Sequence, residues 1–488
     1  MPKAPTARKQ NFLLKPMSEN KTKPRVIIPI VGQGSVIHVI RTGMLDRMSE
    51  FVTPVVAMLW EQPDLIEELK AKGYEVTLMP TYNVTAAYYA LRAKITLWYS
   101  KYVLKSPTRI ILRSYLDLYL PAKKVWKRKL KNALPEFLFA TWPPYIKRLI
   151  KQEGVLIKQQ PCYDAYYTWV RSLQADSIFT ITPFLQEVEL VARILKEQGK
   201  KVMASIHSFD NITTRQWPAF FFDHYLVWNN INKAELERIN PQLKTNNAIT
   251  ICGAAQFDFH YKPNFTWSRE EWLAKLGLPA DKKIILYAGG PVSLFKDEPQ
   301  YLAHLNEAFK AGKIDASEAV ILFRSHPLDK KERWHALVGD SPYIIYDAAQ
   351  SGKEKFDHTN VTEEDIRKLM STVKHADVQI NFTSTMTIDG SVFYRPQIGP
   401  YYTELDKARK EKLTRMMYMQ EHYLPITKSG AINMPASKEA FIQMVSEALQ
   451  NPARYTQHCD DCLDTMITYK DGQTTGRVIA ALKRFYNA

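Results

Sequence analysis

The sequence has few cysteines and no long apolar run, and each shortage excludes a class of protein. Four cysteines are too few for a disulfide framework and favour a reducing compartment. The one Cys-x-x-Cys pair, Cys459 and Cys462, lacks the second ligand pair that a zinc site needs, so we expect no bound metal. No stretch reaches about 18 uninterrupted apolar residues, so we expect no transmembrane helix. The first ten residues lack the apolar core of a secretory signal, which predicts a cytoplasmic protein.

Acidic residues are also scarce relative to basic ones. The chain carries 66 lysines and arginines against 50 aspartates and glutamates, a formal net charge of +16. Such an excess indicates an acidic partner: nucleic acid, an anionic membrane or a phosphorylated substrate. No recognisable DNA- or RNA-binding module accompanies the basic segments, so we expect no nucleic-acid partner.

Strands and helices alternate along most of the chain. With 488 residues the sequence is too long for one ordinary core, so two domains are expected. Apolar runs typical of strands form two series, separated by a spacer at 259–281. The first series is 25–32, 52–60, 74–80, 177–183, 200–211, 224–229 and 248–258, and the second is 283–290, 319–327, 343–348, 377–382 and 396–400. This alternation predicts parallel sheets, an α/β class and two Rossmann-like, doubly wound domains.

One long segment, 82–151, interrupts the first series. It is basic and aromatic without a strand pattern, which predicts a helical insertion in the N-terminal domain. We expect a disordered basic tail over 1–22, an N-terminal domain over 23–262, a C-terminal domain over 263–450 and a helical tail over 451–488.

The composition of this insertion suggests contact with a membrane. In "WYSKYVLK", "KKVWKRKLKN" and "YIKRLIK", lysine and arginine alternate with tryptophan, tyrosine, leucine and isoleucine at helical spacing. A helix lying on an anionic bilayer has this composition. We therefore expect peripheral contact with the inner face of the plasma membrane. The alternative is that these helices pack on the N-terminal sheet and the lysines face water.

Candidate site residues should follow the strands, because ligands bind beyond the carboxyl ends of open parallel sheets. After the first strand, Gly32, Gly34 and Ser35 open a helix, and the glycines allow a backbone to approach a ligand closely. The pattern does not match the dinucleotide fingerprint, and we expect no cofactor. His38, about one turn further on, is a candidate general base. It could equally be a surface or interdomain histidine.

Three further strand ends carry polar residues. Asp210 and Asn211 predict either an acceptor-binding loop or a helix cap. The pair Gly289 and Gly290 predicts a tight turn whose exposed amides suit a phosphate. Two other candidates, Arg324 and His326, are two residues apart on one strand and so point the same way. An arginine and a histidine there could stabilise a diphosphate leaving group, unless the arginine pairs with a neighbouring helix.

The richest stretch is "NFTSTMTIDGSVFYRP" at 381–396. We expect Thr383, Ser384 and Thr385 to begin the helix after a strand, where hydroxyls and unpaired amides can hold a phosphate oxygen. Asp389 lies five residues beyond Ser384, about 7 Å along a helix axis. That is the reach from a diphosphate to ribose hydroxyls. The stretch therefore predicts a site for a nucleoside diphosphate.

Six motifs, in this order, resemble one family. They are "SFDN" (208–211), "YLVWNN" (225–230), "ICGAAQFD" (251–258), "YAGG" (287–290), "RSHP" (324–327) and "STMTIDG" (384–390). The series resembles bacterial surface-carbohydrate glycosyltransferases of the two-Rossmann GT-B type, which are related to the CDP-glycerol glycerophosphotransferases that build teichoic acids. The resemblance implies two domains facing a cleft, with a nucleotide-activated donor in the C-terminal domain and the acceptor in the N-terminal one.

The resemblance implies a metal-independent glycosyltransferase that moves a sugar from a nucleoside diphosphate sugar to a surface polysaccharide or lipid-linked glycan. Glycerophosphotransferases carry an acid shortly before their paired hydroxyls, where this chain has Asn381-Phe382-Thr383, so we favour a sugar donor. Asp389 stands where related sugar transferases usually have glutamate. Three alternatives stay open: a CDP-glycerol-type glycerophosphotransferase, a nucleotide-sugar epimerase on the same fold, and a non-catalytic basic protein that binds membrane or nucleic acid.

Overall fold

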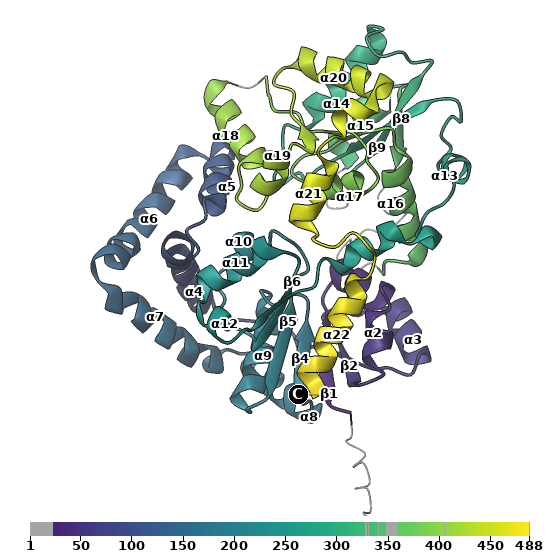
Figure 1. Ribbon diagram of the computed structural model, residues 1–488. Coiled ribbons are helices and arrows are strands. Elements are labelled where there is room, and N and C mark those ends of the chain that lie inside the picture. The colour runs from purple at the N-terminus through teal and green to yellow at the C-terminus, as the bar shows by residue number, and fades with distance from the viewer. Residues whose placement is uncertain are drawn as a thin grey trace, which may run out of the picture.

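The protein folds into two α/β domains, each built on a parallel sheet (Figure 1). The computed structural model describes residues 23–326, 329, 331–339, 341–347, 360–404 and 406–487. The predicted tail at 1–22 lies outside the described residues. Both sheets are entirely parallel, which confirms the predicted class and the two Rossmann-like domains.

The N-terminal sheet has seven strands in the order β3-β2-β1-β4-β5-β6-β7. Its strands are β1 (Arg25–Ile30), β2 (Thr53–Met58), β3 (Glu75–Leu78), β4 (Ser177–Thr180), β5 (Lys201–Ser205), β6 (His224–Val227) and β7 (Ile249–Ile251). The central strands are apolar along their length rather than alternating, because helices cover both faces of a parallel sheet.

Short helices connect these strands. They are α1 (Gln33–Ser35), η1 (Val36–Arg41), α2 (Met44–Met48), α3 (Pro63–Ala71), α8 (Tyr163–Ser172), α9 (Gln186–Glu197), α10 (Asn211–Thr214), α11 (Asn230–Ile239) and α12 (Gln242–Thr245). Two 3-10 helices, η5 (Ala255–Tyr261) and η6 (Pro263–Phe265), lead out of the sheet toward the second domain.

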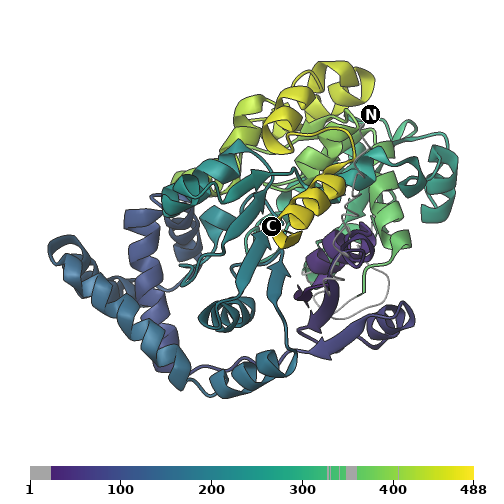
Figure 2. The same ribbon diagram turned by 60° about the horizontal axis from the view of Figure 1, so that its bottom comes forward.

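The segment between β3 and α8 is helical and extends to one side of the N-terminal sheet (Figure 2). It consists of α4 (Ala86–Trp98), η2 (Tyr99–Val103), α5 (Thr108–Leu116), η3 (Asp117–Tyr119), α6 (Ala122–Thr141), α7 (Pro143–Leu156) and η4 (Ile157–Gln159). Buried charges join α4 to α9 of the sheet and to α7 of the same segment: Arg92 donates to Glu189 on α9 at 2.7 Å and to Glu153 on α7 at 3.3 Å. The segment also reaches the second domain, where Tyr119 donates to Asp297 at 2.5 Å.

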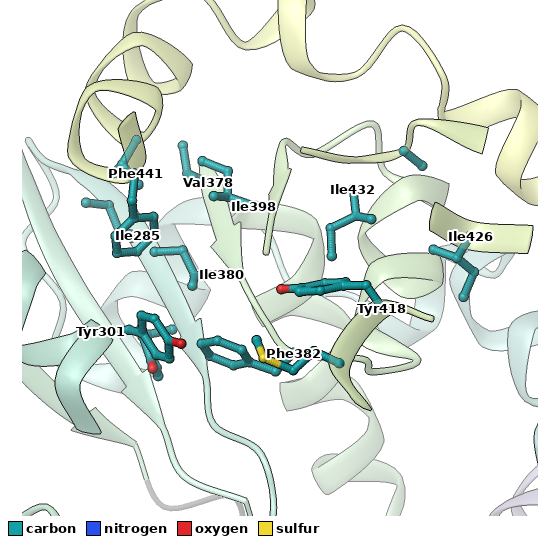
Figure 3. Packing of buried hydrophobic residues seen from close by; sticks show 14 of the residues in the cluster. Ile285, Tyr301, Val378, Ile380, Phe382, Ile398, Tyr418, Ile426, Ile432 and Phe441 are labelled. Carbon is teal, nitrogen blue, oxygen red and sulfur yellow. The ribbon is translucent and has the colours of Figure 1, made fainter. Parts of the chain in front are cut away.

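The C-terminal sheet has six strands in the order β10-β9-β8-β11-β12-β13. They are β8 (Lys283–Ala288), β9 (Ala319–Arg324), β10 (Ile344–Asp347), β11 (Val378–Ile380), β12 (Gln397–Ile398) and β13 (Ile432–Asn433). The last strand, β13, was not predicted. Its Ile432 packs with Ile380, Ile398 and Tyr418 in a core formed by sheet and helices (Figure 3).

Helices cover both faces of this second sheet. They are α13 (Arg269–Leu276), α14 (Pro299–Lys310), η7 (Lys331–Arg333), α15 (His335–Val338), α16 (Glu363–His375), α17 (Met386–Val392), α18 (Lys407–Tyr418), α19 (Leu424–Ser429), α20 (Lys438–Gln450), η9 (Pro452–Tyr455) and α21 (Cys459–Met466). None of the helices in the described ranges is long and apolar enough to cross a membrane.

The last helix, α22 (Thr474–Asn487), returns to the N-terminal domain (Figure 1). Its Val478, Ile479 and Leu482 are buried in the same cluster as residues of β1 and β2. Buried Asp258 accepts hydrogen bonds from the two amides at the start of α22, both at 2.8 Å. A carboxylate is favoured there because the first amides of a helix have no partner within it.

Candidate active site at the domain junction

Residues that follow strands of one sheet meet residues that follow strands of the other. His260, in η5 after β7, lies 2.9 Å from Asp389 in α17, the helix that follows β11. Thr213, in α10 after β5, lies 3.5 Å from the ring of His422, just before α19. The carboxyl ends of the two sheets thus face one junction, the place where open parallel sheets bind ligands.

On the N-terminal side, the turn after β1 packs tightly. The carbonyl of Gly32 accepts the amides of Ser35 and Val36, at 3.0 and 3.2 Å. The Ser35 hydroxyl is buried and accepts the amide of Val31 at 3.2 Å. A side chain at Gly34 would begin 3.4 Å from the ring of His207, at van der Waals distance. A role for Gly32, Gly34 and Ser35 in acceptor binding stays a prediction.

His38 is buried within the N-terminal domain, so it is neither a surface nor an interdomain histidine. Its Nε2 lies 2.6 Å from the side-chain oxygen of Gln256, which can only accept, so that nitrogen carries the proton. Burial, and then the neighbouring His207, lower the pKa of His38 to about 3. The ring is therefore neutral at physiological pH. It is also a weak proton acceptor, because a general base works best with a pKa near the operating pH.

Asp210 precedes α10, yet its side chain does not cap that helix. It accepts instead from the hydroxyls of Ser208 at 2.5 Å and Thr214 at 3.0 Å, and from the amide of buried Asn211 at 3.2 Å. Burial raises the pKa of Asp210, but His422 of the other domain and the Ser208 bond outweigh it and hold the pKa below its usual value. The helix-cap alternative is therefore wrong for this carboxylate, which remains ionised at the junction.

The glycine turn after β8 differs from its prediction. The amide of Gly289 donates to the carbonyl of Arg324 at 2.9 Å. The amide of Gly290 donates to both carboxylate oxygens of Glu298, at 3.0 and 3.1 Å. Both amides are thus engaged, and the expectation of exposed amides for a phosphate is wrong for this structure. The two glycines instead allow close packing, since a side chain at Gly290 would overlap Phe295.

The arginine at the end of β9 pairs with an acid across the sheet. Arg324 donates to Asp347, its register partner on β10, at 2.8 Å. Asp347 also accepts from Lys368 on α16. Within the described residues, its ion pair is thus with a residue of a neighbouring strand. Burial lowers the pKa of His326, against the opposing charge of Asp329, so this histidine is neutral near pH 7.

The hydroxyl-rich stretch forms a turn before α17 rather than its first residues. The helix begins at Met386, with Thr385 as its N-cap. Thr383 adopts a left-handed conformation, with φ of 43°, and its hydroxyl donates to the carbonyl of Met417. That conformation is strained for a β-branched residue, so the surrounding contacts must hold it. The Ser384 hydroxyl accepts the amide of Met386 at 3.2 Å.

Asp389 is 7% exposed and lies against a histidine that the sequence analysis did not identify. The ring of His260 stacks between Phe257 and Phe393, with centroids 4.8 and 5.6 Å away. Within the part of the chain that the structure describes, neither ring nitrogen of His260 has hydrogen-bond geometry to a partner. Its 2.9 Å approach to Asp389 is thus a close polar contact rather than a hydrogen bond.

Two other junction residues, Glu298 and His422, were also missed. Neither lies in a motif or directly after a predicted strand, so no local pattern marks them. The cysteines of the Cys-x-x-Cys pair are buried on α21. Burial raises the pKa of Cys459 to about 11 and that of Cys462 to about 12, so both thiols stay protonated.

A family model described as CDP-Glycerol:Poly(glycerophosphate) glycerophosphotransferase matches residues 214–483, more than half of the chain. The chain belongs to this family. The match spans β6 and β7 together with every strand of the C-terminal sheet. No curated protein sequence matches the chain.

Solved structures resemble the chain in fold over nearly its whole length. A protein from Listeria monocytogenes described as a UDP-N-acetylglucosamine 2-epimerase has a TM-score of 0.54 at 11% identity and covers 96% of this chain and 97% of its own. S. aureus MnaA with UDP has 0.53 at 9%, covering 95% and 97%. The UDP-GlcNAc 2-epimerase of Methanocaldococcus jannaschii has 0.52 at 10%, covering 95% and 100%. At such low identity these likenesses show the GT-B-like fold alone.

The glycerophosphotransferase family and the fold together make this protein a GT-B-type transferase with a nucleotide-activated donor. Enzymes of this family act in teichoic-acid-type polymer biosynthesis. The fold likeness to epimerases does not carry their activity to this chain, because one fold supports several chemistries.

Proposed function

We propose that this protein transfers glycerol phosphate from CDP-glycerol to a hydroxyl of a surface polymer or lipid-linked acceptor. The family match over 214–483 carries the proposal, because it spans the whole C-terminal sheet and the turns at its carboxyl edge. It favours the glycerophosphotransferase alternative over the sugar transferase that the sequence motifs favoured.

The burial of Asn381 weakens the argument for a sugar donor, which rests on Asn381-Phe382-Thr383 standing where glycerophosphotransferases carry an acid. Asn381 is fully buried: its amide donates to Gln397 at 2.9 Å, and its oxygen accepts from the Thr387 hydroxyl at 2.7 Å. Both polar ends are thus bonded inside the C-terminal domain. The missing acid therefore changes a packing network beneath the turn and not the groups that a donor could touch. This departure from the family pattern does not argue against CDP-glycerol.

The proposed reaction breaks the phosphoanhydride bond of the donor. The acceptor oxygen attacks the phosphorus that carries glycerol, a new P–O bond forms, and CMP leaves with the electron pair of the anhydride bond. The acceptor proton passes to a base, for which His38 remains the prediction from sequence. In-line displacement at phosphorus depends mainly on positioning and on stabilising the charge of the phosphate oxygens.

Residues on the C-terminal side of the junction take the donor in this proposal. Arg324 and His326, at the end of β9, meet the phosphates. Ser384 and Thr385 supply hydroxyls before α17, and Asp389 accepts from the ribose hydroxyls. Asp210, which stays ionised on the N-terminal side, helps to bind the acceptor.

The nucleotide released identifies the reaction. Incubation of the protein and an acceptor with CDP-glycerol should release CMP, because phosphorus is attacked, whereas transfer of a sugar from UDP- or CDP-sugars would release the nucleoside diphosphate. Chromatography of the nucleotides separates these products. Release of UDP or CDP from sugar donors, with CDP-glycerol inert, would overturn the proposal. Isomerisation of UDP-GlcNAc without nucleotide release would identify an epimerase.

Variants test the proposed donor residues separately from the chemistry. Ser384→Ala and Asp389→Ala should each weaken CDP-glycerol binding by about 1–3 kcal/mol, through lost hydrogen bonds. Arg324→Ala should lower turnover more than donor affinity if it meets charge that develops on the leaving phosphate. Ser172→Ala, at an exposed serine ending α8, is the matched control and should leave calorimetric affinity unchanged. Unaltered affinity in both Ser384 and Asp389 variants would remove this turn from the donor site.

A further inference from the structure

Helix α6 presents a row of large apolar side chains to solvent. Trp126 is 63% exposed, Leu130 60%, Leu134 65% and Phe137 62%. Spacings of four, four and three residues place them on one face of the helix. We call these four residues the α6 stripe. Trp142, directly after the helix, is also 46% exposed.

The opposite face of α6 holds the helix in place. Phe139 is buried against the rest of the insertion. Arg128 pairs with Asp117 through two bonds of 2.6 Å, which ties the start of α6 to the end of α5. Figures 1 and 2 both place α6 on the outer rim of the molecule, away from the two sheets. The contacts of Phe139 and Arg128 thus fix the orientation of α6, and the α6 stripe faces solvent.

The net charge of the protein is concentrated in the insertion that contains this helix. Residues 82–151 contain 15 lysines and arginines but only two acids, and therefore carry +13 of the formal net charge of +16. Both acids are neutralised locally, Asp117 by Arg128 and Glu136 by Lys101. Exposed lysines border the α6 stripe: they are Lys123, Lys127, Lys129 and Lys131.

We propose that α6 docks on an anionic lipid bilayer, with the α6 stripe at the boundary between headgroups and acyl chains and the bordering lysines on lipid phosphates. Tryptophan and phenylalanine with leucine on one face, and lysines beside them, suit an interfacial helix. The inference does not rest on the proposed reaction. It narrows the membrane contact expected of 82–151 to one helix face.

Other occupants fit these features less well. A second copy of the chain would bring two segments of +13 together, and their repulsion opposes association. The phosphates of a nucleic acid would bind the lysines, but they would leave the aliphatic side chains of Leu130 and Leu134 in water. A bilayer with acidic headgroups accepts both kinds of side chain at once.

Depth of insertion can be measured at a single residue. All four native cysteines are buried, so Leu134→Cys introduces one accessible thiol for an environment-sensitive fluorophore. Vesicles of phosphatidylcholine with increasing phosphatidylglycerol should shift its emission to shorter wavelength, whereas Lys313→Cys, in an exposed turn of the C-terminal domain, should not respond. A silent label at position 134 would overturn the proposal.

Co-sedimentation with the same vesicles tests the two kinds of side chain separately. Replacing Leu130 and Leu134 with serine should reduce binding at least about tenfold, because the apolar contribution scales with buried area. Each of Lys123→Gln, Lys127→Gln and Lys131→Gln should reduce it about fivefold. Arg128 is kept, since it holds the helix.

The controls are matched in charge and exposure. Lys244→Gln, Lys310→Gln and Lys313→Gln remove the same charge from exposed sites elsewhere and should bind like the unaltered protein. Equal loss in this control set, or equal binding to vesicles without phosphatidylglycerol, would overturn the assignment to an anionic surface. So would binding to RNA without binding to vesicles, or a dimer that only the two serine substitutions dissociate.

Discussion

The substitution Asn381→Asp tests whether this position affects folding or donor choice. It restores an acid near the place where glycerophosphotransferases carry one, with almost no change in volume. Asn381 is 0% exposed and donates to the Gln397 side-chain oxygen at 2.9 Å. An aspartate would turn that bond into a contact between two acceptors. Gln397 cannot reverse its amide without cost, because its nitrogen already donates to Gln379 and to the Arg395 carbonyl.

The expected loss of stability follows from these contacts. Losing the hydrogen bond costs about 1 kcal/mol, and burying a carboxylate whose partner cannot donate costs about 2–4 kcal/mol more. We therefore expect the free energy of unfolding to fall by about 3–5 kcal/mol at pH 7. The loss should shrink near pH 5, because a buried aspartate has a raised pKa and takes up a proton there.

Urea unfolding followed by circular dichroism at both pH values measures this loss. Asn246→Asp, at an exposed asparagine between α12 and β7, is the matched control and should change stability by less than about 0.5 kcal/mol. Folded Asn381→Asp protein should keep its preference between CDP-glycerol and UDP-sugars. A variant that is as stable as the parent and switches donor would refute the reasoning, because the side chain would then have to reach the substrate.

Three further predictions concern buried titratable groups. Burial raises the pKa of Glu298 to about 8 from 4.5, so the folded protein retains a proton that the unfolded chain releases, and stability falls as the pH rises between those values. Glu298→Gln should make the urea midpoint nearly independent of pH between pH 5 and 8, because it removes a stability difference of about 3 kcal/mol. A pH dependence equal to that of the parent protein would contradict the raised pKa of Glu298. Arg92→Ala should lower the free energy of unfolding by about 3–5 kcal/mol, because Glu153 and Glu189 stay buried without the arginine. Lys94→Ala, at an exposed position on the same helix, should lower it by less than about 0.5 kcal/mol in the same urea assay. A pKa of about 3 keeps His38 neutral from pH 5 to 8. His38→Gln should therefore lower kcat/KM without changing how kcat/KM depends on pH. If the variant lost a fall in kcat/KM below about pH 6.5, the low pKa of His38 would be contradicted.

The sequence predicts which segments are buried, because burial depends on local composition. Continuous apolar runs such as 25–32 and 283–290 correspond to β1 and β8, since parallel strands are covered on both faces. Local composition also predicted the helical insertion. The two-residue strand β13 was not predicted, and its pairing with β12 defines it in the structure.

The sequence by itself thus determined the class of fold, the two sheets and the turns at which polar residues gather. Only the tertiary structure decided which groups those residues meet. Glu298 takes the amide of Gly290, and His260 from the first domain lies against Asp389 of the second. The contact of His260 with Asp389 joins positions far apart in the chain, and the bond from Gly290 to Glu298 joins residues eight positions apart at no helical or strand spacing, so no local period encodes either. They arise only when the folded elements bring these residues together at the ends of the strands.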